Sequence, residues 1–166
     1  ISAYVEGSSY NKAIALYNGT KHAINIADYA LGIQRNGEGD FVNYWQLPDD
    51  VLQAGDTYII VSSSCDEGSA LRQYADAFIP SLETSPLNFN GNDAIALYHN
   101  RILSDVVGRV GSVENWGKDI TLYRSPATLG PTTEYNELQW QQAPKDDFAQ
   151  LRSHTMQGVT DTPTLV

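Results

Sequence analysis

Short apolar segments separated by frequent turn residues are the feature that most constrains this fold. Tyr29–Gln34 alternates between apolar and other residues, which is typical of a half-buried strand. Thr57–Val61 is a continuous β-branched run, which is typical of a central strand. Regular alternation of strands with long helices is absent from the sequence, so a doubly wound fold is excluded. The pattern predicts an all-β, antiparallel β-sandwich of about nine or ten short strands with at most one short helix.

Two local predictions are specific enough to check. Ala94–Tyr98 and Ile102–Val107 are joined by the short link His99-Asn100-Arg101, which predicts a β-hairpin. The single helix is expected at Asp66–Tyr74, capped by Ser64 or Asp66, with Leu71 and Tyr74 facing inward.

Composition limits the class of protein and its partners. The 166 residues are 42% hydrophobic, enough for one packed core, so we expect one folded domain rather than a disordered chain. No apolar run is long enough to predict a membrane helix. The net charge of −10 argues against a broad face for nucleic acid, because phosphate affinity depends on clustered Lys and Arg. We expect the domain at 1–154 and a linker at 155–166, in an excised or processed piece of a larger protein.

Five segments in order resemble the lamin tail domain, as it occurs in bacterial secreted proteins. They are Ile1–Asn18 with its Glu-Gly-Ser-Ser turn, Leu87–Leu97 around Asn-Gly-Asn-Asp, Ile102–Gly111, Thr121–Arg124 and Trp140–Thr155. The resemblance implies an immunoglobulin-like sandwich. It also implies an accessory role, because bacterial members are attached to extracellular nucleases and phosphatases.

Two positions depart from the family pattern. Bacterial members usually have Glu where this chain has Ala15, and Gly where it has Arg152. The first departure removes a carboxylate that we expect to have paired with Lys12 or an ion. Asp105, inside an apolar strand, is expected to accept hydrogen bonds from backbone N–H groups of a neighbouring loop.

No constellation of residues predicts catalysis. The sequence has no Gly-x-Ser-x-Gly motif, and its histidines His22, His99 and His154 are isolated, with His154 expected to cap the end of the domain. Cys65 is the only cysteine, and its acidic neighbours are expected to raise the pKa of a half-buried, unreactive thiol. We interpret the adjacent carboxylate pairs as solvated surface charge; they are Asp49-Asp50, Asp66-Glu67 and Asp146-Asp147.

Calcium is the cofactor that the sequence leaves open. Calcium prefers several oxygen ligands on loops, and Asn90, Asn92 and Asp93 provide a dense oxygen cluster. Glu38 and Asp40 form a weaker candidate loop. Neither matches an EF-hand, and a well-bonded turn is the simpler reading of both.

Aromatic and basic residues are candidates for binding a carbohydrate, a protein or a nucleic acid. Trp45 and Trp116 are the candidate contacts for a carbohydrate or protein surface, with packing at the core as the alternative. Direct binding of nucleic acid is not expected. It would require clustering of scattered residues, namely Arg101, Arg109, Lys118 and Arg124 with the aromatic residues Tyr10, Trp45, Trp116 and Tyr135.

These observations predict a non-catalytic accessory module of an extracellular bacterial protein. Its expected partners are the catalytic domain of the same polypeptide and a cell-surface, protein or substrate contact. The alternatives are a calcium-dependent adhesion domain, a carbohydrate- or DNA-binding domain, and a part of a hydrolase whose active site lies in another segment.

Overall fold

The computed structural model describes residues 1–80, 83–157 and 165, which form twelve strands and four short 3-10 helices. The strands are β1 (Ala3–Glu6), β2 (Lys12–Tyr17), β3 (Ile24–Asn25), β4 (Tyr29–Gln34), β5 (Val42–Gln46), β6 (Val51–Leu52), β7 (Thr57–Ser62), β8 (Ala77–Ile79), β9 (Ala94–His99), β10 (Ile102–Val107), β11 (Ile120–Arg124) and β12 (Trp140–Pro144). The 3-10 helices are η1 (Ile26–Asp28), η2 (Arg35–Gly37), η3 (Ala70–Tyr74) and η4 (Glu137–Gln139).

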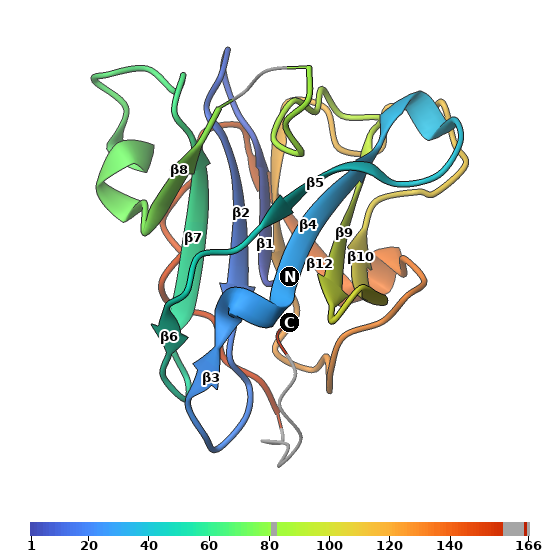
Figure 1. Ribbon diagram of the computed structural model, residues 1–166. Helices are drawn as coiled ribbons and strands as arrows, with labels where there is room; N and C mark the ends of the chain where they lie inside the picture. The colour runs from blue at the N-terminus through green and yellow to red at the C-terminus, as the bar shows by residue number, and fades with distance from the viewer. Residues whose placement is uncertain (81–82, 158–164, 166) are drawn as a thin grey trace.

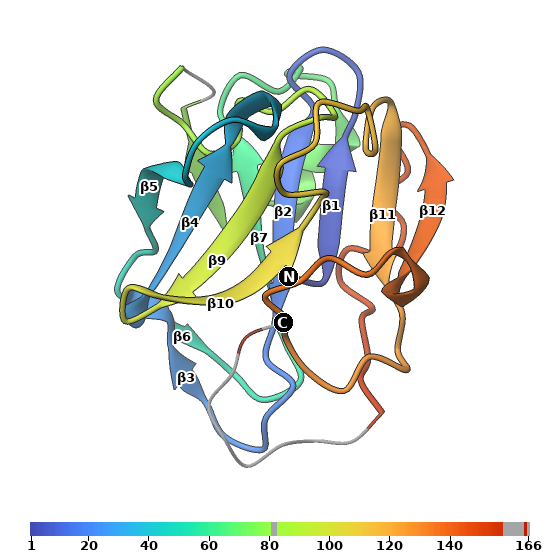
Figure 2. The same ribbon diagram turned by 90° about the vertical axis from the view of Figure 1, so that its right-hand side faces the viewer.

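Two large sheets form the predicted sandwich. One has six strands in the order β12-β11-β1-β2-β7-β8, and the other has four in the order β10-β9-β4-β5 (Figure 1). The short pair β3-β6 lies at the lower end of the molecule, and β11 and β12 form the right-hand edge of the six-stranded sheet in Figure 2. The all-β, immunoglobulin-like class expected from the sequence is confirmed.

Alternation along the strands builds the core between the sheets. Ile14 and Leu16 of β2 point into it from the six-stranded sheet, and Leu31 and Ile33 of β4 point into it from the other sheet. All four side chains are fully buried. Packing two apolar sheet faces against each other removes this surface from water, which is the main stabilising contribution.

A second apolar layer covers the opposite face of the six-stranded sheet. Ala13 and Ala15 of β2 face this layer, together with Ile59 of β7. Leu71 of η3 and Leu151 near the end of the chain pack against them. Because both of its faces are covered, β2 is buried along its whole length.

Three details differ from the sequence prediction. The expected helix at Asp66–Tyr74 is a 3-10 helix at Ala70–Tyr74, and its cap is Ser69, whose hydroxyl accepts from the Leu71 backbone N–H, instead of Ser64 or Asp66. The β7–β8 ladder is parallel, whereas the other ladders are antiparallel. The described strands also outnumber the expected nine or ten, partly because β3 and β6 have only two residues each.

The predicted hairpin is confirmed as β9–β10. Its turn residues Asn100 and Arg101 both have positive φ, +49° and +67°, as a tight hairpin turn of the mirror-image type requires. A register shift between Leu103 and Asp105 marks a bulge in β10.

The predicted linker at 155–166 falls mostly outside the described residues. Of its described residues, Gln157 donates to the Pro126 carbonyl at 2.8 Å, and Leu165 forms an isolated bridge with Asn18. The boundary at residue 154 stays a prediction. None of the helices in the described part of the chain has the length and apolar character needed to cross a membrane.

Candidate functional site

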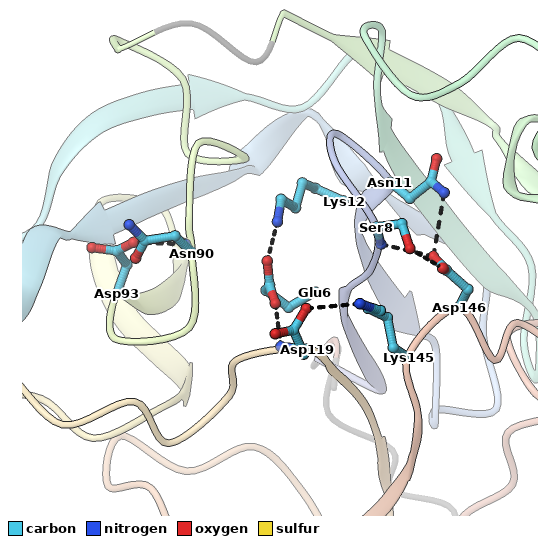
Figure 3. Close-up of polar contacts among 9 residues, drawn as sticks. All are labelled: Glu6, Ser8, Asn11, Lys12, Asn90, Asp93, Asp119, Lys145 and Asp146. Atoms are coloured by element: carbon cyan, nitrogen blue, oxygen red, sulfur yellow. Dashed lines mark hydrogen bonds and ion pairs between the residues drawn. The ribbon is translucent and has the colours of Figure 1, made fainter.

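The Glu-Gly-Ser-Ser turn and the residues around it form a polar cluster where β1 ends and β2 begins (Figure 3). We call Glu6, Ser8, Asn11, Lys12, Asp119 and Asp146 the turn cluster. Glu6 and Lys12 are direct partners in the β1–β2 ladder, and their side chains form an ion pair that is almost completely buried. The second carboxylate oxygen of Glu6 accepts from the Asp119 backbone N–H. A buried ion pair needs such additional donors, because burial removes the water that would otherwise solvate it.

Asp146 holds the turn itself. One of its oxygens accepts from the Ser8 backbone N–H at 2.9 Å and from the Asn11 amide at 3.2 Å, and the other accepts from the Ser8 hydroxyl. Burial alone would raise the pKa of Asp146, but the hydrogen bonds from Ser8 and Asn11 outweigh it and hold the pKa below its usual value. A Cβ at Gly7 would lie 2.4 Å from Asp146 Oδ1, so the turn has no room for a side chain there.

The Asn-Gly-Asn-Asp loop is built around Asp93, which is 3% exposed. Its two oxygens accept from the backbone N–H groups of Asn36 at 2.8 Å and Asn90 at 2.9 Å. Asn92 donates to the Asn36 side chain at 3.1 Å. The carboxylate of the calcium candidate is thus occupied by backbone donors. Among the described residues, no three His, Cys, Asp or Glu side chains gather as a metal site, and the calcium hypothesis stays a prediction.

Asp105 forms a second buried ion pair that crosses between the two sheets. Arg124 of β11 donates to its Oδ2 at 2.5 Å, and both side chains are fully buried. The Thr132 backbone N–H donates to Oδ1 at 2.9 Å, which confirms the predicted loop donor. Sequence reasoning considered Arg124 only as a possible nucleic-acid contact and missed it as the partner of Asp105. The available signal was its position in β11, where it shares the inward face with Leu122.

The comparison with family models decides the classification. The model of the Lamin Tail Domain matches residues 1–111, which include the Glu-Gly-Ser-Ser turn, the Asn-Gly-Asn-Asp loop and Asp105. The chain belongs to the lamin tail domain family. No curated protein and no solved structure matches it significantly.

The two departures from the family pattern have structural meanings in this lamin tail domain. Ala15 and Lys12 lie on opposite faces of β2, and Lys12 already pairs with Glu6. A carboxylate at position 15 would therefore not reach Lys12, so the expected pairing with Lys12 was wrong, and the alternative of an ion stays a prediction. Arg152 donates two hydrogen bonds to the Asp76 carboxylate, of 2.6 and 2.8 Å. Its guanidinium also donates to the Thr57 and Tyr74 carbonyls.

The candidate contact residues Trp45 and Trp116 are half-buried and pack against the core. The Trp116 ring lies 5.0 Å from the Tyr4 ring and 5.6 Å from the Tyr135 ring. A Cβ at Gly108, where φ is +106°, would lie 2.2 Å from the Trp116 ring. These contacts give Trp116 a packing role, and a ligand contact by either tryptophan stays a prediction.

Two of the basic residues considered for nucleic acid are already paired with carboxylates of the domain. Arg124 is buried against Asp105, and Arg109 is bound by Glu114 and Glu137. The predicted surface charges Asp146 and Asp147 are half-buried and also have structural partners: Asp146 holds the β1–β2 turn, and Asp147 accepts from the Tyr123 hydroxyl at 2.9 Å.

Cys65 and His154 both pack against other parts of the fold. Cys65 is 3% exposed rather than half-buried, and burial is the main cause that raises the pKa of its thiol. His154 packs edge-on against Tyr17, with ring centroids 4.7 Å apart. Burial, followed by nearby positive charge that includes Arg124, lowers the pKa of His154 to about 4.

Proposed function

We propose that this lamin tail domain is a non-catalytic accessory module of a larger bacterial extracellular protein, a secreted nuclease or phosphatase. It positions or anchors the catalytic part through contacts with protein, a surface or substrate.

The observation that carries the proposal is how the polar residues of the family motif are used. Glu6, Lys12 and Asp93 are buried, and their charged groups bind one another or the backbone. A catalytic acid, base or nucleophile must instead reach a substrate. The motif therefore builds a rigid scaffold, and function falls to the exposed surface of the sheets.

The test is a turnover assay of the purified domain. DNA, RNA and a phosphate monoester are supplied with Mg²⁺, Mn²⁺ or Ca²⁺. We expect no hydrolysis above that of a heat-denatured sample. Turnover that depends on the folded domain would overturn the proposal.

A second experiment addresses the anchoring role. In the full-length polypeptide, deletion of the domain is expected to leave kcat on a small soluble substrate unchanged and to reduce retention of the protein on its surface or macromolecular substrate. Loss of kcat on the small substrate would place part of the active site in this domain and contradict the proposal.

A further inference from the structure

The outer face of the four-stranded sheet contains a groove of about 610 Å³. Its floor is Ala30 of β4, which is flanked in the sheet by Gln46 of β5 and Tyr98 of β9. The neighbouring residues Leu31 and Leu97 point into the core, so Ala30 and Tyr98 point outward. The volume falls within the roughly 300–1,000 Å³ of small-molecule sites.

Two tyrosines form the walls of this groove. Tyr44 is 57% exposed, and its ring lies edge-on to that of Tyr98, with centroids 5.1 Å apart. The Tyr44 hydroxyl donates to the Phe41 carbonyl at 2.8 Å, which fixes its ring. A Cβ at Gly32 would lie 3.1 Å from the Tyr44 ring, so the ring rests directly on the strand. The rings are therefore held in place before any ligand arrives, which reduces the entropy cost of binding.

Polar groups complete the lining. The Gln46 amide nitrogen donates to the Tyr29 carbonyl at 2.6 Å and to the Ala27 carbonyl, which leaves Oε1 as an acceptor. At the far end, the Asn100 backbone N–H donates to the Asp28 carbonyl at 2.8 Å and fixes the hairpin turn. Arg101 in that turn has φ of +67°, a conformation that favours glycine.

We propose that this groove binds a neutral oligosaccharide. The electron-rich faces of the exposed Tyr44 ring and the half-buried Tyr98 ring suit the polarised C–H bonds of a sugar ring. The amides of Gln46 and Asn100 with the side chains of Asp28 and Arg101 supply donors and acceptors for hydroxyl groups. The single carboxylate and the single guanidinium of the lining cancel, and the net charge of −10 disfavours a polyanion. The proposal rests on the accessory role and names the contact through which the domain anchors its host.

The test is calorimetric titration of the domain with cellohexaose, chitohexaose and maltohexaose. We expect at least one to bind to the unaltered domain. Tyr44→Ala and Ala30→Leu, which remove a wall and fill the floor, are expected to lower its affinity by about tenfold or more. Tyr10→Ala is the matched control, because Tyr10 is also an exposed tyrosine, 49% exposed, on the β1–β2 turn. It is expected to bind like the unaltered domain, and thermal unfolding checks that each variant folds.

Three results would overturn the groove as a saccharide site. They are the absence of binding to all three oligosaccharides, binding that survives both groove variants, and binding of single-stranded DNA or an acidic peptide that depends on Tyr44. Each would leave the accessory role in place, because that role fails on a different result, turnover by the folded domain.

Discussion

At the scale of single residues, the loss of the Arg124 charge is expected to cost stability. It is fully buried, donates to Asp105 across the two sheets, and lies over the Trp140 ring at 5.0 Å. Arg124→Met leaves the Asp105 carboxylate buried without its guanidinium. We expect the free energy of unfolding to fall by about 3–5 kcal/mol, measured by urea denaturation.

Arg109→Met is the control for this prediction. Arg109 also binds two carboxylates, Glu114 and Glu137, but its side chain is 40% exposed. Solvent screens exposed pairs and they contribute little, so this variant is expected to stay close to the unaltered domain. Equal losses for the two variants would contradict the distinction between buried and exposed pairs.

Asp93 separates a structural role from a calcium site. Asp93→Asn replaces an acceptor of the Asn36 or Asn90 N–H with an amide donor. We expect a loss of about 1–3 kcal/mol in the free energy of unfolding, equal in calcium and in chelator. The Asp56→Asn variant serves as control, because Asp56 is exposed and lies outside both candidate calcium loops. A calcium-dependent shift in Tm of the unaltered domain that Asp93→Asn abolishes would support the calcium hypothesis and contradict a purely structural role.

At the scale of elements, the turns fix how the loops meet the strands. Gly91 has φ of +108°, and a Cβ there would lie 2.5 Å from the Lys118 backbone. Gly39 has φ of +63° but open space around it. Gly91→Ala and Gly39→Ala each place a side chain at a positive φ, which is expected to lower the free energy of unfolding by about 1 kcal/mol. Only Gly91→Ala adds a clash with backbone. Urea denaturation is expected to show at least twice the loss for Gly91→Ala; equal losses would contradict the close approach.

The elements also show what the sequence could predict. Period-two alternation and turn residues are local, so they predicted the sandwich and the β9–β10 hairpin. The parallel β7–β8 pairing, the Asp105–Arg124 pair and the Tyr44–Tyr98 groove depend on which strands become neighbours. No local pattern encodes that choice. Trp45 and Trp116 were predicted contacts because of their residue type. The exposed aromatic residue of the groove is instead Tyr44, which precedes Trp45 in β5 and points to the outer face of the sheet.

At the scale of the whole molecule, the buried polar groups and the open groove lie in different places. The turn cluster ties segments from both ends of the chain together, and the Asn-Gly-Asn-Asp loop holds η2 through Asp93 and Asn36 (Figure 3). The outer face of the four-stranded sheet carries the groove. Buried polar contacts hold one end of the domain, and the groove leaves one sheet face accessible. This arrangement suits a module that binds a ligand without catalysing a reaction.

The pH dependence of the whole fold follows from His154. The pKa of this half-buried imidazole is about 4 in the folded domain, against about 6.5 in the unfolded chain. Between these values only the unfolded chain binds the proton, so acidification from pH 7 toward pH 4 favours unfolding. Allowing for solvent screening of a half-buried ring, we expect a loss of about 1–2 kcal/mol over this range.

His154→Phe keeps the ring that packs on Tyr17 and removes the titrating group. Urea denaturation at pH 7 and pH 4.5 is expected to show a smaller loss for this variant than for the unaltered domain. The lowered pKa of Asp146 acts in the same direction but below the range measured, because its stabilisation is lost only as the pH falls through the folded pKa of that carboxyl. The same loss in both proteins would show that His154 does not link the fold to pH.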